Sequence, residues 1–159
     1  MNSLLKHLMN RRDKMVPKFR GKRKDNGEWV VGVPIPNSFC NVVHMIPILL
    51  TDKVAYPPER LHEYLIEILP ETLGQSTGLK DKNGVEIFEG DVIGSQNKDR
   101  SNWYVSHHKI VWHDTGFVGK QICSSSFIGL EHWTRGENGY VVIGNIYENP
   151  ELLEQADES

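Results

Sequence analysis

The stretch that decides the fold is Gly74–Ile93, which reads GQSTGLKDKNGVEIFEGDVI. It places Asn83-Gly84 between two extended segments, the strongest short-range signal for a β-hairpin. A two-residue type I′ turn needs a positive φ at both central residues, and Asn followed by Gly adopts it at the lowest steric cost. After the turn, Val85, Ile87 and, beyond the break at Gly90, Val92 alternate with polar residues, apart from Phe88. This alternation predicts a strand with one buried face.

Further turn signals recur along the chain. Two more Asn-Gly pairs occur at Asn26-Gly27 and Asn138-Gly139. Glu89-Gly90-Asp91 predicts a bend, because Gly tolerates strained torsions and Asp can bond its own backbone two residues on. Such turns between many short strands favour a mainly β fold. Because the Glu-Gly-Asp bend is similar to the corner turns of small barrels, we expect a small, curled antiparallel barrel, SH3-like, with a short N-terminal helix.

The chain begins with a short amphipathic segment. Residues 3–15 place Leu4, Leu5, Leu8 and Met9 on one helical stripe. A helix this short is marginal alone in water, so its apolar stripe must dock on another surface. That surface is either the β body of the same chain or a second subunit. We therefore divide the chain into an N-terminal helical arm (1–16), a β domain (17–153) and a disordered acidic tail (154–159).

Two regions in the middle of the chain are harder to assign. Five prolines between Pro34 and Pro58 indicate loop or edge strand, because Pro cannot donate to a central ladder. Within this region, Val42-Val43 and Ile46–Leu50 are candidate short strands separated by Pro47. The segment 59–69 fits a helical repeat, yet Tyr64–Leu69 also has the length and composition of a strand.

The second half of the chain suggests a series of hairpins. Residues 103–112 predict a strand, Asp114-Thr-Gly116 a turn, and residues 117–122 the returning strand. Further short strands are expected at 127–133 and 140–143, and residues 95–102 read as a polar loop.

The charge is unevenly distributed along the 159 residues, whose net charge is −3. Residues 1–24 contain nine of the 18 Lys and Arg and one acid, Asp13, so they carry +8 and the rest carries −11. Such asymmetry indicates an interaction arm. Strand alternation places four lysines and arginines on one face of the first strand, next to an aromatic side chain. We read these residues either as a solvated face or as a nucleic-acid contact: Lys18, Arg20, Lys22, Lys24 and Trp29.

Several segments together resemble the YopX-like family of bacteriophage and prophage proteins. The resemblance runs from about Lys18 to Leu153, and its motifs are Phe19–Lys22, Asn26–Val30, Thr77–Gly84, Ile87–Ile93 and Ile143–Leu152. It implies a mainly β fold, no established biochemical activity and no catalytic residues to carry over. It also favours a short turn followed by a strand for residues 59–69.

Catalytic and metal-binding patterns are weak. His107 and His113 share one strand face, but they lie roughly 20 Å apart at ~3.3 Å per residue, too far to share one zinc ion without a bend or other ligands. His113-Asp114 with a distant His44 or His132 is the remaining metal arrangement. Glu86, Glu89 and Asp91 are candidate general acids or bases. For Asp91, a role in the turn is the simpler interpretation. Trp29, Trp103, Trp112, Trp133, Tyr104 and Tyr140 form either core or a stacking platform.

We therefore expect a phage- or prophage-encoded accessory protein that acts by binding rather than catalysis and forms a homo-oligomer. No catalytic residue, cofactor or metal is expected. The partner would be a host or phage protein, or nucleic acid through residues 18–24; a metal-dependent hydrolase using His107–Asp114 ranks third. No segment reaches the ~18 apolar residues of a membrane helix. Two isolated cysteines, Cys40 and Cys123, suit reduced, buried or half-buried thiols in the cytoplasm of a bacterial host cell, with a single disulfide as the alternative.

Overall fold

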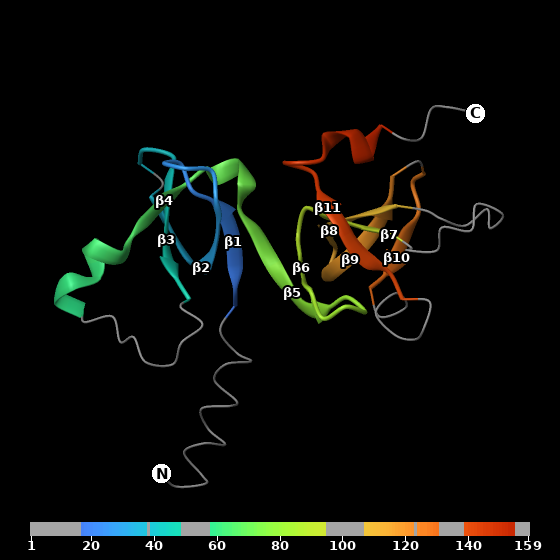
Figure 1. The fold of residues 1–159 in the computed structure, drawn as a ribbon, viewed down its shortest axis with the longest axis horizontal. Helices are drawn as coiled ribbons and strands as arrows, with labels where there is room; N and C mark the ends of the chain where they lie inside the picture. The colour runs from blue at the N-terminus through green and yellow to red at the C-terminus, as the bar shows by residue number, and fades with distance from the viewer. Residues whose placement is uncertain are drawn as a thin grey trace, which may run out of the picture. The chain divides into compact units, whose positions relative to one another are not determined.

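A computed structural model describes residues 17–37, 39–48, 58–94, 107–122, 124–130 and 139–154. The described residues are mainly β, as expected, and form eleven strands and three short 3-10 helices (Figure 1). The chain divides into two compact units, Met1–Gln75 and Ser76–Ser159. The predicted N-terminal helix (1–16) lies outside the described residues, as does the tail from residue 155, so the boundaries drawn from the sequence stay predictions.

The first unit is an antiparallel sheet in the order β4-β3-β2-β1. Its strands are β1 (Phe19–Lys22), β2 (Trp29–Asn37), β3 (Val42–Pro47) and β4 (Ile66–Ile68). The 3-10 helices η1 (Pro58–Tyr64) and η2 (Pro70–Thr72) flank β4. The start of β5 (Gly74–Lys80) pairs with β1 through Gly74 and Gln75.

One face of this sheet forms the core of the first unit. Met45 and Ile68 are fully buried beside Val43, and Phe19, Val30, Ile66 and Leu73 pack against them. Each such side chain contributes about 1.5–3 kcal/mol when it is fully removed from water. The opposite face of β1 and β2 therefore points away from this core.

The second unit contains the predicted central hairpin and a five-stranded antiparallel sheet in the order β10-β9-β8-β7-β11. The hairpin pairs β5 with β6 (Glu86–Phe88). The sheet strands are β7 (Asp91–Gly94), β8 (His108–His113), β9 (Gly116–Gln121), β10 (Phe127–Gly129) and β11 (Val141–Asn145), and η3 (Pro150–Leu153) follows β11. Ile87, Ile93, Ile110, Leu130 and Tyr140 form its core.

The Asn83-Gly84 hairpin is confirmed, but its predicted type I′ turn is wrong. Gly84 has a φ of 83°, whereas Asn83 is not among the residues with positive φ. The Asp81 carboxylate determines the turn instead: its Oδ1 accepts hydrogen bonds from the N–H groups of Asn83 and Val85 at 2.8 and 2.9 Å. The Asp81 N–H donates to the Val85 carbonyl at 2.8 Å, so three residues form the loop.

The Glu-Gly-Asp bend is also confirmed. Gly90 has a φ of 84°. Its N–H donates to the Ile110 carbonyl and its carbonyl accepts from the Ile146 N–H, which ties the bend to two neighbouring segments. Asp91 is 1% exposed, and its Oδ2 accepts from the Phe88 N–H at 2.8 Å. The Asp91 carboxylate therefore closes the bend by accepting from the residue three positions before it, whereas the predicted bond was to the backbone two positions after it. Asp91 thus has a turn role.

The proline-rich region differs in part from its prediction. β2 runs through Pro34 and Pro36, and β3 is one strand from Val42 to Pro47 rather than two strands separated by Pro47. Both prolines of β2 lie beyond Gly32, where the pairing with β1 stops. This half of β2 pairs with β3 on one side and is an edge on the other. On the edge side, the missing N–H groups cost no ladder bond. The turn and strand expected for residues 59–69 are confirmed by η1 and β4.

The described residues form no closed barrel, so the SH3-like architecture is not confirmed. A single bridge between Arg23 and Ile68 does curl the first sheet, bringing β4 towards the end of β1. At the turn between β2 and β3, Cys40 is a free and exposed thiol, which corrects the expectation of burial. Cys123 lies outside the described residues.

Candidate functional site

The basic segment forms the first hairpin, and strand alternation places its charges as predicted within β1. Arg20 lies opposite Val31 and Lys22 opposite Trp29, whereas Phe19 and Val30 point to the core. Arg20, Lys22 and Trp29 therefore share the sheet face that is directed away from the core. Lys18 is half-buried just before β1 begins.

The two cations of this face gather on the Trp29 indole. The Arg20 guanidinium carbon lies 4.7 Å and the Lys22 Nζ 5.6 Å from the ring centroid. Both distances fall within the ~6 Å over which the ring quadrupole attracts a cation. A ring face that a cation occupies is not open to a nucleotide base, so Trp29 here organises charge.

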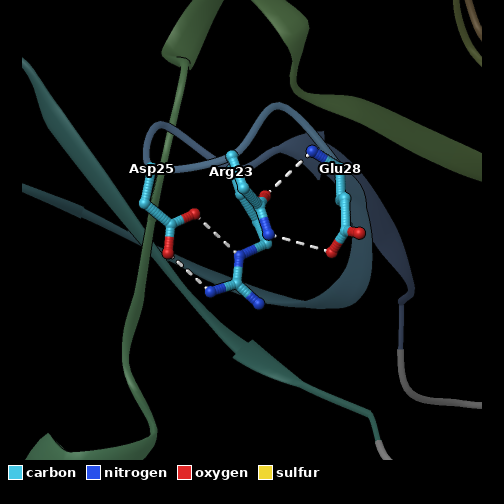
Figure 2. A network of polar contacts seen from close by, with 4 residues as sticks. Arg23, Asp25 and Glu28 are labelled. Carbon is cyan, nitrogen blue, oxygen red and sulfur yellow. Dashed lines mark hydrogen bonds and ion pairs between the residues drawn. The ribbon is translucent and has the colours of Figure 1, made fainter.

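The turn after β1 pairs its cations with acids. Arg23 donates from Nε and Nη2 to both Asp25 carboxylate oxygens, at 2.9 and 2.6 Å (Figure 2). This hydrogen bonding raises the pKa of Arg23 and lowers the pKa of Asp25. On the far side of the turn, the Glu28 N–H donates to Asn26 Oδ1 at 3.0 Å.

Lys24 departs from the predicted row of charges on one strand face. It belongs to the turn rather than to β1, and its Nζ lies 2.5 Å from Glu67 Oε1 on β4. A cavity of about 340 Å³ beside the turn is lined by Arg23, Lys24, Asp25, Leu65, Ile66 and Glu67. Both cations of this lining are paired with acids. Of the predicted contact residues, Arg20 and Lys22 share the outer face of β1 with Trp29.

The histidines that the structure describes do not form a shared site. His108 is fully buried in β8 with its ring edge against Tyr140, whereas His113 is exposed, with Nδ1 3.2 Å from Asp114 Oδ2. Within the described residues, no group of three or more His, Cys, Asp or Glu side chains is placed to hold a metal ion. His44 lies in β3 of the first unit, and His132 lies outside the described residues.

Partial burial lowers the pKa of His107 below its ordinary value. The unfolded chain, with a pKa of about 6.5 at this residue, then takes up a proton before the folded chain does. The neutral His107 side chain therefore favours the folded state above about pH 6.5. This stabilisation is lost as the pH falls from about 6.5 towards the lower pKa that His107 has in the folded protein.

The proposed aromatic platform is not assembled as one surface by the described residues. Tyr140 is in the core of the second unit, and Trp112 is 53% exposed with its ring edge against Phe117, at 4.9 Å between centroids. Trp103, Tyr104 and Trp133 lie outside the described residues. Trp29 belongs to the first unit, where it contacts cations.

Sequence reasoning missed two features of the second unit. Asp81 is 6% exposed, and its Oδ2 accepts from the Val142 N–H at 3.0 Å, a contact across 61 positions that no local pattern encodes. Lys109 on β8 lies directly opposite Lys120 on β9. The sequence predicts a turn over Asp114–Gly116, whereas His113 pairs with Gly116 across a two-residue turn, and this shorter turn fixes the register that brings the lysines together.

The fold defines a mainly β protein, and its best candidate sites are charged and aromatic sheet faces. The chain belongs to the YopX protein family, whose sequence profile matches residues 18–154. A crystal structure of protein EF1440 from Enterococcus faecalis is similar to it, with 32% sequence identity and a TM-score of 0.55. The similarity covers 87% of this chain and 98% of that one. No curated protein matches this chain. Among the described residues, no helix is long and apolar enough to cross a membrane.

Proposed function

We propose that this YopX-family chain is a phage- or prophage-encoded accessory protein of the bacterial cytoplasm that acts by binding rather than by catalysis, and that it self-associates. The observation that carries the proposal is a row of exposed apolar side chains along β2 and into the following turn. Val33 is 37% exposed, Ile35 41%, and Phe39 fully exposed. Large apolar side chains that remain exposed together are typical of protein–protein contacts.

Val33 and Ile35 lie on the side of the sheet that does not hold the core. Pro34 pairs with Met45, a core residue, so the neighbouring Val33 and Ile35 point the other way. Their exposure is therefore set by strand alternation. Burying this row against a partner would remove it from water, at about 25 cal/mol per Å² of apolar surface.

The occupant that we propose is the N-terminal segment of a second copy. The sequence of residues 3–15 predicts an apolar helical stripe that must dock on a surface. Thirteen helical residues would extend about 20 Å at ~1.5 Å each. Val33 and Ile35 lie ~7 Å apart along β2 at ~3.3 Å per residue, and Phe39 adds a third exposed apolar side chain in the turn that follows. An apolar helical stripe offers this row the apolar contact that it lacks.

Light scattering tests this proposal. The full chain at micromolar concentration is expected to exceed the monomer mass, and the double variant Val33→Thr/Ile35→Thr to shift towards the monomer. Val85→Thr is the matched control, because Val85 is 50% exposed but lies in the second unit. A strictly monomeric full chain would count against self-association, and so would an equal shift in the control.

Nucleic-acid binding through the first hairpin is a second candidate, favoured by the gathering of Arg20 and Lys22 on Trp29. Affinity for nucleic acid that rests on such charges must fall steeply with salt. Charge reversal at both residues (Arg20→Glu/Lys22→Glu) is expected to weaken binding of an oligonucleotide at low salt and to flatten its salt dependence. Lys82→Glu is the control, since Lys82 is exposed in the second unit. Absence of binding at low salt would remove this candidate.

A further inference from the structure

Two lysines of the second unit face each other across neighbouring strands. The β8–β9 register places Lys109 directly opposite Lys120, so both side chains emerge on one sheet face. Like charges in this arrangement destabilise a sheet. Within the described parts of the chain, neither ammonium group makes an ion pair. As far as the described residues extend, the positive charge of this pair is therefore not compensated by an acid.

Two exposed rings lie on the same face. Phe127 on β10 pairs with Lys120 and is 43% exposed. The His113 ring lies 4.1 Å from the Phe127 ring, centroid to centroid, at a tilt of 38°. Alternation along β8 places His113 on the same side as Lys109. We call Lys109, Lys120, His113 and Phe127 the lysine–ring face.

We propose that the lysine–ring face binds single-stranded nucleic acid. The lysines would contact phosphates and release counterions, and the exposed Phe127–His113 pair would stack on a base. Sheet faces that present rings to splayed bases are a general mode of single-strand recognition. An acidic protein would satisfy the lysines but would leave the rings without a role. Asp114 contacts the face only at its end, through His113. This inference is independent of self-association through the apolar row, which lies in the first unit.

Fluorescence anisotropy of a labelled oligothymidylate of about 20 nucleotides, titrated with the full chain at low salt, tests the proposal. Lys120→Glu is expected to weaken binding at least tenfold and to reduce the slope of log affinity against log salt by about 1 or more. Phe127→Ala is expected to weaken binding about tenfold through lost stacking. Because Glu at position 120 would lie opposite Lys109, the urea midpoint of Lys120→Glu should stay equal or rise. Lost binding in this variant therefore cannot be attributed to unfolding.

Three controls distinguish the lysine–ring face from a general charge effect, from the first hairpin and from an acidic protein partner. Lys82→Glu changes the same charge on an exposed turn of the second unit and should leave binding within about twofold. The proposal is overturned if the chain does not bind the oligonucleotide at low salt. It is also overturned if only Arg20→Glu/Lys22→Glu weakens binding, which would assign it to the first hairpin. Equal binding of polyglutamate with no effect of Phe127→Ala would overturn it in favour of an acidic protein partner.

Discussion

Gly32→Ala is expected to destabilise the first unit by about 3 kcal/mol, because the added methyl group has no space and the neighbouring backbone cannot move away. An ideal Cβ on Gly32 would lie 2.1 Å from the Ile46 carbonyl oxygen and 2.7 Å from Met45 Cγ. The contact with a backbone oxygen is decisive, since β2 and β3 are held in register there by the Gly32–Pro47 and Val33–Ile46 pairs. Urea unfolding would measure the loss, and hydrogen exchange would locate it in β1–β3.

Gly116→Ala is the matched control for this prediction. An ideal Cβ on Gly116 meets nothing within 4 Å, and its φ is not positive. The same substitution should therefore change the free energy of unfolding by less than about 0.5 kcal/mol. Equal effects of the two variants would mean that the close β2–β3 contact at Gly32 is not the constraint that we describe.

Asp81→Ala is expected to destabilise the second unit by about 2–4 kcal/mol, because one buried carboxylate satisfies three backbone donors and each lost acceptor costs about 1–3 kcal/mol. Oδ1 accepts from the N–H groups of Asn83 and Val85, and Oδ2 from that of Val142 on β11. The carboxylate therefore holds the β5–β6 turn and occupies a donor on an outer strand of the sheet. Urea unfolding followed by far-UV circular dichroism measures the loss.

A graded pair of variants tests the role of each oxygen of Asp81. Asp81→Asn keeps an acceptor for the turn but places an amide N–H₂ near the Val142 donor, so its loss should be about half that of Asp81→Ala. Asp25→Ala removes an exposed turn carboxylate in the first unit and should cost little. If Asp81→Ala costs no more than Asp25→Ala, the three hydrogen bonds to the Asp81 carboxylate do not stabilise the fold.

Local patterns predict most of the strands of this chain. The Asn83-Gly84 turn and the Gly90 bend require particular torsions within a few residues, so the sequence indicates them directly. The single buried face predicted after the turn is wrong, because Ile87 and Phe88 are both buried and so are all four residues of β7. The type I′ turn fails because the Asp81 side chain takes the N–H groups of Asn83 and Val85, leaving Gly84 alone with a positive φ. The length of β2 is missed because Pro34 and Pro36 exclude only central pairing, and that half of the strand is an edge.

The candidate sites are predictable where they depend on alternation alone. Alternation places Arg20 and Lys22 together, but it cannot show that Lys24 turns towards Glu67, 43 positions away in the chain. The Lys109–Lys120 pair needs the strand register, and the Asp81–Val142 contact needs the tertiary fold. Division into two units is likewise a property of long-range contacts, which a single sequence pattern does not contain.

Self-association is the central functional claim, and sedimentation equilibrium tests it most directly. Full-length chain and a chain lacking residues 3–15 would be compared over a range of micromolar concentrations. The account predicts a mass above that of the monomer for the full chain and a shift to monomer for the deletion. Strict monomers in both samples across the whole range would contradict it.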